Sequence, residues 1–224
     1  FGALVTAFPN TGFMGVPLLA ALFGPTIVGP MIATILIDMF VTSSLCIALA
    51  QVGSSAGGAR EAALRSLRGA LSNPMPWAIA AGGLCSVMGW RPSGPVDAVI
   101  RMLADAASPV ALFTIGAVLW RAGQHAHHRT EPKRFVPQAL MKLLLHPLLV
   151  FMVALAAGQL GLPLTPLQIT AIVLTAALPS AANVAMLAER FGADNGRIAR
   201  IIMTSTVLAF ASFTLLAWVF GARG

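Results

Sequence analysis

Charged residues are scarce in this sequence, and their scarcity excludes most classes of soluble protein. Of the 224 residues, 9% are charged and 58% are hydrophobic, which is too apolar for an ordinary soluble domain of this length. Signatures of common enzymes are also missing: there is no HExxH motif, no Walker loop, no dinucleotide fingerprint and no GxSxG frame around Ser180. We therefore predict a membrane protein without enzymatic activity.

Candidate metal and redox sites are equally few. The two cysteines, Cys46 and Cys85, lie in separate apolar stretches and are interpreted as packing residues, so no disulfide is predicted. His125, His127 and His128 have some of the spacing of metal ligands, but they lie in a short basic loop in which Glu131 is the one acidic residue close by and no cysteine is near. A solvated loop is the favoured interpretation, and no metal or cofactor is expected.

Long apolar stretches, by contrast, are abundant. A helix needs about 20 mostly apolar residues to cross the hydrocarbon core. Seven stretches approach or exceed this length, each bounded by glycine, proline or charged residues: residues 1–23, 26–51, 74–90, 97–120, 135–157, 166–188 and 198–220. The sequence therefore predicts an all-α polytopic membrane protein with about seven transmembrane helices in this chain.

The basic residues predict the orientation of these helices. Ten of the fourteen lysines and arginines lie in the links 53–71, 121–134 and 189–200, which share one side if the chain weaves back and forth. The positive-inside rule makes that side cytoplasmic and places the carboxyl terminus outside the cell membrane. The expected location is the cell inner (plasma) membrane. The net charge of +7 is then a topological signal, and no nucleic-acid partner is expected.

Two of the predicted helices contain a proline near the middle of an apolar run. Pro9 is followed by Asn10, and Pro179 is followed by small residues and Asn183. Each run then closes on Phe-Gly and leads into a last long span. In the weaving topology the two runs point in opposite directions, which is typical of transporters built from inverted repeats.

The two helix breaks free backbone groups that can bind a ligand. Proline removes an amide donor and leaves backbone groups unpaired, which at membrane depth is tolerated only where the backbone is buried in protein or lines a wet cavity. The freed groups and the half-helix ends can hold an anionic ligand, while Gly12 and Gly15 would let two backbones cross closely. A purely structural kink is the alternative for either break alone. The candidate substrate-binding residues are Pro9, Asn10, Pro179 and Asn183.

At these breaks the sequence resembles a known family. FPNTGFMGVPLLAALFG and LPSAANVAMLAERFG look like the two crossover helices of the auxin efflux carrier family, which includes plant auxin exporters and bacterial carriers assigned to malonate and similar acids. LADAASPVALFTIGAVL is similar to a span in the second repeat of that family. The resemblance covers the whole chain and implies a fold of ten helices in two inverted repeats of five, with substrate bound where the broken helices cross.

The resemblance also implies a division of the chain. Residues 1–52 would hold the last two helices of the first repeat (broken helix 1–23 and helix 26–51), 53–71 a cytoplasmic link, and 72–224 a complete second repeat of five helices with broken helix 166–190. Three helices of the first repeat would then precede this chain, so the expected function is that of an intact, longer protein.

Three titratable residues are candidates for coupling transport to an ion. Asp38 lies in the middle of a predicted span, where an ionised carboxylate normally faces a cavity or a partner. Asp105 lies about two turns into another span, and His146 titrates near neutrality when unperturbed. A hydrogen-bonded structural role is the alternative for Asp38, and a packing role is the alternative for His146.

Three further charged residues, in addition to these candidates, are interpreted as structural. Asp97 and Arg101 are four residues apart on one helical face and are predicted to form an ion pair. Lys142 lies four residues before His146, and we expect its side chain to snorkel toward the cytoplasm.

The favoured function is a secondary active or facilitative carrier of small organic anions, such as malonate or auxin-like acids, that works by alternating access at the crossed helices. Its expected partners are a small carboxylate, a proton or sodium ion, and the lipid bilayer; a homodimer is one option for its assembly. The rival hypothesis is a membrane sensor or assembly subunit that retains the carrier fold but transports nothing. The substrate, the coupling ion and the direction of transport stay open.

Overall fold

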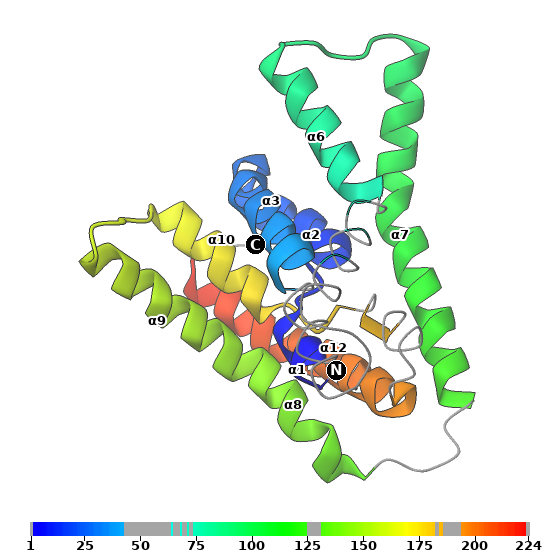
Figure 1. The fold of residues 1–224 in the computed structure, drawn as a ribbon, viewed down its shortest axis with the longest axis vertical. Coiled ribbons are helices and arrows are strands. Elements are labelled where there is room, and N and C mark those ends of the chain that lie inside the picture. The colour runs from blue at the N-terminus through cyan, green and yellow to red at the C-terminus, as the bar shows by residue number, and fades with distance from the viewer. Residues whose placement is uncertain are drawn as a thin grey trace. The chain divides into compact units, whose positions relative to one another are not determined.

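The computed structural model describes residues 2–42, 74–124, 131–181 and 194–222, together with positions 64, 68, 71, 184 and 185. These residues are almost entirely helical (Figure 1). Within the described ranges, the one β-type pairing outside helices is a single antiparallel bridge. The predicted all-α class is confirmed for this part of the chain.

The chain divides into two compact units, which are described separately. The first comprises residues 1–35 and 113–224, and the second comprises residues 36–112. The first unit therefore joins the amino-terminal segment to the carboxy-terminal part of the chain.

The amino-terminal segment of the first unit is a series of short helices. They are α1 (Gly2–Ala7), the π-helical segment η1 (Thr11–Gly15), α2 (Val16–Phe23), the 3₁₀ turn η2 (Pro25–Ile27) and α3 (Val28–Ile37). Gly24 ends α2 with φ of 84°, a backbone conformation that residues with a Cβ rarely adopt. The chain can therefore turn sharply from α2 into η2.

The carboxy-terminal part contributes a longer set of helices. They are η4 (Pro132–Arg134), α8 (Val136–Leu140), the π-helical segment η5 (Met141–Leu145), α9 (His146–Gln159), α10 (Pro166–Ala177) and α12 (Asn195–Val219). A capping box between Thr165 and Gln168 starts α10. Helices α9 and α10 lie side by side, and α12 packs against α8, η5 and α10 (Figure 1).

Both π-helical segments of this unit precede a proline. Pro17 lies two residues after η1, and Pro147 lies two residues after η5. Proline has no amide to donate to the carbonyl four residues earlier, and a local widening of the helix is one way to accommodate that loss. The sequence thus loosens the helix just after the first break and again around Lys142.

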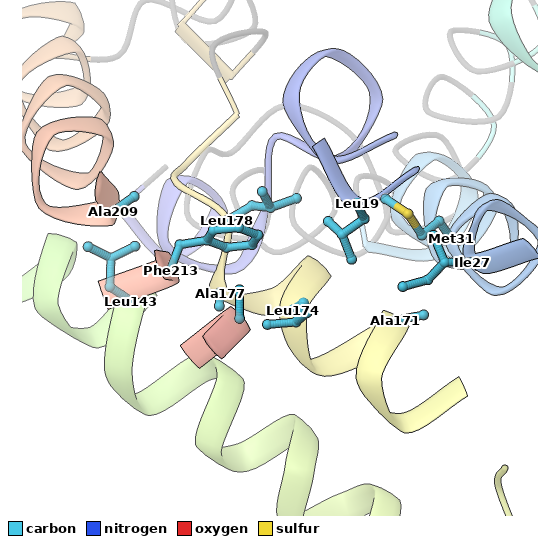
Figure 2. Packing of buried hydrophobic residues seen from close by; sticks show 11 residues of the cluster. Leu19, Ile27, Met31, Leu143, Ala171, Leu174, Ala177, Leu178, Ala209 and Phe213 are labelled. Atoms are coloured by element: carbon cyan, nitrogen blue, oxygen red, sulfur yellow. The ribbon is translucent and has the colours of Figure 1, made fainter. Parts of the chain in front are cut away.

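A buried apolar cluster joins the two parts of the first unit (Figure 2). Its side chains come from α2, η2, α3, η5, α10 and α12 and from the residue after α10: Leu19, Ile27, Met31, Leu143, Ala171, Leu174, Ala177, Leu178, Ala209, Phe213 and Ala217. Burial of large apolar side chains contributes about 1.5–3 kcal/mol each in water, but between helices in lipid, close packing carries more of the attraction. The amino-terminal helices are thus held against α10 and α12.

The second unit contains η3 (Asp38–Thr42), α6 (Pro74–Val87) and most of α7 (Pro95–Gln124). The turn between α6 and α7 uses Gly89 and Gly94 at φ of 65° and 62°. Near the start of α7, Arg101 Nε donates to Asp97 Oδ2 at 2.7 Å. The predicted ion pair is confirmed.

Three helical segments in the described ranges are long and apolar enough to cross a membrane: Pro25–Thr42, Val136–Gln159 and Gly196–Val219. The last two have 24 residues each, which at about 1.5 Å per residue exceeds a hydrocarbon core of about 30 Å. Shorter apolar helices cover Thr11–Phe23, Trp77–Val87 and Pro166–Ala177. The chain is a helical membrane protein, and the count of seven spans stays a prediction.

Candidate functional site

The first helix break pairs directly with the second. Pro9 and Ser180 face each other in an antiparallel bridge. On one side the Asn10 amide donates to the Pro179 carbonyl at 2.9 Å, and on the other the Ala181 amide donates to the carbonyl of the residue before Pro9 at 2.9 Å. Backbone groups that each proline takes out of its own helix therefore satisfy each other, as buried peptide groups must.

The second break leaves a helix carbonyl without its usual donor. In a continuous helix the Ser180 amide would donate to the Ala176 carbonyl, but α10 ends at Ala177 and Leu178 is extended. The Ser180 amide donates instead to Oγ of Ser205 on α12 at 3.2 Å, and that hydroxyl donates to the Ile202 carbonyl at 3.0 Å. The Ala176 carbonyl is thus available to another donor.

Lys142 supplies that donor. Its Nζ donates to the Ala176 carbonyl at 2.7 Å, although the two residues belong to different helices. The side chain of Lys142 is fully buried, with 0% exposure. The interpretation of Lys142 as a snorkelling side chain is therefore wrong, because the negative end of α10 binds the amine inside the protein.

His146 also contacts the Lys142 amine. Lys142 Nζ lies 2.8 Å from Nδ1 of His146, one helical turn further along. An ammonium has donors only, so Nδ1 accepts this hydrogen bond when the Lys142 amine is protonated, and the roles reverse when the amine is neutral and Nδ1 carries the proton. The Lys142 amine therefore links the predicted ion-coupling residue His146 to the carboxyl end of the broken helix α10.

Gly15 allows the two broken helices to approach closely. A Cβ built on Gly15 would lie 2.6 Å from Cδ1 of Leu178 and 3.1 Å from Cε of Met31. Real Cβ atoms do not approach other heavy atoms to 2.6 Å, and Leu178 and Met31 are themselves fully buried. Gly15 thus leaves room for the Leu178 and Met31 side chains beside the first break, and the close crossing of two backbones stays a prediction.

Neutral polar side chains gather around the paired breaks. Asn10, Thr11, Thr175 and Ser180 are buried, with 6% exposure at most. Among the described residues, no partner bonds the hydroxyls of Thr175 and Ser180, and the Asn10 side chain does not cap the helix that follows it. These groups can donate to or accept from a ligand without carrying a charge.

The structure brings some of the predicted site residues together. Pro9, Asn10 and Pro179 meet at the bridge, and Lys142 connects His146 to the Ala176 carbonyl near the end of α10. Asn183 lies outside the described residues, as do the loop histidines and Cys46.

The two candidate aspartates belong to the second unit. Asp38 is half-buried at the start of η3, and its Oδ1 accepts from the Thr42 hydroxyl at 3.2 Å. Asp105 is exposed on α7. In the part of the chain that the structure describes, no group of three potential metal ligands is found.

Sequence reasoning missed Ser205 and the role of Lys142. The signal for Lys142 was a lysine in an apolar span with a histidine one turn later, which is equally compatible with snorkelling. Ser205 had a weaker signal still, since a serine within a span usually bonds its own helix backbone.

Known proteins resemble this chain along its whole length. A family model described as membrane transport protein matches residues 1–219. A protein of Rhizobium meliloti (strain 1021) named "Putative malonate transporter" is 28% identical over 222 residues, which cover 95% of this chain and 64% of that protein. "Uncharacterized transporter YfdV" of Escherichia coli (strain K12) is 26% identical over 224 residues, covering 99% of this chain and 67% of that protein. The chain thus spans just under two thirds of the length of the Rhizobium relative.

Proposed function

Because the chain belongs to the membrane transport protein family, the auxin efflux carrier family that its helix breaks resemble, we propose that the intact protein is a carrier of small organic anions. It works by alternating access at the two crossed, broken helices. In support, the bridge between Pro9 and Ser180 lies inside one compact unit that joins the amino-terminal and carboxy-terminal parts of the chain. A moving element with a ligand site at its centre requires such a unit.

The observation that carries this proposal is the backbone bridge between Pro9 and Ser180. Irregular backbone at membrane depth is costly and is tolerated only where it is buried in protein or lines a wet cavity. The bridge satisfies the main-chain groups nearest the two prolines, while the buried Thr175 and Ser180 hydroxyls, which have no partner among the described residues, stay available to a ligand.

The proposed substrate is a small carboxylate. Amide and hydroxyl donors bind carboxylate oxygens well in a site shielded from water. The name of the Rhizobium relative includes malonate, and this supports a dicarboxylate as the first compound to test.

The topology and coupling predicted from the sequence complete the proposal. Residues 1–52 end a first repeat, 53–71 form a cytoplasmic link and 72–224 form the second repeat in the inner membrane. Asp38, Asp105 and His146 are the candidates for ion coupling, and a homodimer is one option for its assembly.

Flux measurements on the intact protein in sealed proteoliposomes test the proposal. We expect uptake of labelled malonate or another small carboxylate, and we expect Asn10→Ala and Asn183→Ala each to lower uptake at least several-fold. Thr170→Ala is the matched control, because that exposed hydroxyl of α10 bonds its own helix at the Pro166 carbonyl. Normal uptake by both asparagine variants would refute the site.

The rival function, a sensor or assembly subunit, predicts a different pair of results. Such a protein would bind a carboxylate with normal affinity but would carry none across sealed vesicles. Equilibrium binding measured beside flux therefore separates the two functions.

A further inference from the structure

The carboxyl end of α10 has the chemistry of a cation site. The last carbonyls of a helix have no donors from their own helix and carry the negative end of its dipole. Here Pro179 supplies no amide, and the Ser180 amide is bonded to Ser205. The carbonyl of Ala176 therefore faces the interior as a strong acceptor.

A buried amine occupies this position. The Nζ of Lys142 lies 2.7 Å from the Ala176 carbonyl oxygen and 2.8 Å from Nδ1 of His146, with the side chain at 0% exposure. A charge so deeply buried is stable only when its ligands replace the water it has lost. Backbone carbonyl oxygens at the carboxyl ends of half-helices are also ligands of small monovalent cations, and the His146 nitrogen is a second acceptor beside the Ala176 oxygen.

We propose that the Lys142 ammonium is a built-in cation that fills a monovalent cation site at the end of the half-helix α10. The Lys142 ammonium then keeps a positive charge at the second break permanently, so transport does not require sodium at this site. Truncation of Lys142 vacates the site and lets a small free cation bind there. The consequence for transport rests on the proposed carrier function, whereas the cation site itself rests only on the fold.

Chemical rescue of the intact protein tests the site without relying on transport. Lys142→Ala removes the equivalent of n-propylammonium from the interior, leaving Ala176 and His146 without their shared donor. We expect its melting temperature in detergent to fall by about 3–10 °C, from the cost of an unpaired buried polar group and the scaling of melting temperature with size. Added n-propylammonium should restore most of this loss in a saturable manner.

Four controls separate the effect of charge from those of volume and salt. 1-Propanol has a similar size but no charge, and choline chloride matches the ionic strength, so neither should rescue Lys142→Ala. Lys142→Met fills the space without a charge and should melt low without being rescued. Lys142→Arg keeps the charge and should melt closer to the wild type than Lys142→Met.

The outcomes are distinguishable from those of the proposed function. Equal rescue by 1-propanol, or no saturable response to n-propylammonium, would overturn the cation site, as would Lys142→Met melting at the wild-type temperature. If Lys142→Ala does not fold, the melting temperatures of Lys142→Arg and Lys142→Met test the cation site instead. Wild-type flux that is equal in sodium and choline supports the consequence for transport, and flux that requires sodium overturns it. A wild type without any flux, but with a rescued Lys142→Ala, would refute the carrier and leave the cation site standing.

Discussion

Pro9 and Ser180 face each other in an antiparallel bridge although they lie far apart in the sequence. The bridge joins two helices at the points where each is interrupted, and its two hydrogen bonds are both 2.9 Å long. This pairing explains how the protein tolerates two breaks in apolar helices, because each break supplies the hydrogen-bond partners that the other lacks.

Restoring an amide at the second break should extend α10. In Pro179→Ala, the new amide can donate to the Thr175 carbonyl and pull the following residues into the helix. We expect the melting temperature to stay within a few degrees of the wild type while carboxylate flux falls about tenfold or more, the equivalent of losing about 1.4 kcal/mol at the site. Pro166→Ala, at the first turn of α10 where proline is normally tolerated, is the control and should retain its flux.

A methyl group at Gly15 should force the crossing apart. Gly15→Ala places a Cβ 2.6 Å from Leu178 Cδ1, and overpacking of this kind costs about 1–3 kcal/mol. Thermal unfolding in detergent should show a clear drop in melting temperature. Gly158→Ala on α9, where nothing lies within 4 Å of the added Cβ, should be neutral or slightly stabilising.

A double-mutant cycle identifies the cause of that drop. If the clash with Leu178 is responsible, Gly15→Ala combined with Leu178→Ala will be less destabilised than the sum of the single variants. Strict additivity would contradict the close contact.

Ser205 should stabilise the second break from α12. In Ser205→Ala, the buried Ser180 amide loses its acceptor, which costs about 1–3 kcal/mol when a buried donor is left unsatisfied. We expect a lower melting temperature. Ser212→Ala is the matched control on the same helix, because that exposed hydroxyl bonds only its own helix at the Leu208 carbonyl; an equal loss in both variants would argue against a special role for Ser205.

The Ser180 hydroxyl provides a test of substrate contact. It is 1% exposed and has no hydrogen-bond partner among the described residues, so Ser180→Ala should leave the melting temperature unchanged or slightly raised. If the hydroxyl bonds the carboxylate, the KM for transport should rise about 2–10-fold, from a net hydrogen-bond contribution of about 0.5–1.5 kcal/mol. An unchanged KM would remove Ser180 from the site.

Much of the fold was predictable because its determinants are local. Low charge and long apolar runs indicate membrane helices whatever their neighbours, and Pro9 and Pro179 interrupt a helix through their own covalent structure. The ion pair of Asp97 with Arg101 was equally predictable, since residues four apart lie on one face of any helix.

The partners of the freed groups were not predictable in the same way. A lysine within an apolar span can snorkel to the surface or bind inside, and Lys142 binds inside because the carboxyl end of α10 lies within reach of its amine. Ser205 was unremarkable until α12 was seen to bring its hydroxyl to the Ser180 amide.

The sequence by itself determined that this is an apolar helical protein with two interrupted helices, because composition, helix length and the missing proline amide act within a few residues of chain. Only the tertiary structure decided that the interruptions bond to each other and that Lys142 closes the end of α10. Those hydrogen bonds join residues far apart in sequence, and they exist because close packing at Gly15 and burial around Leu178 bring the two breaks together.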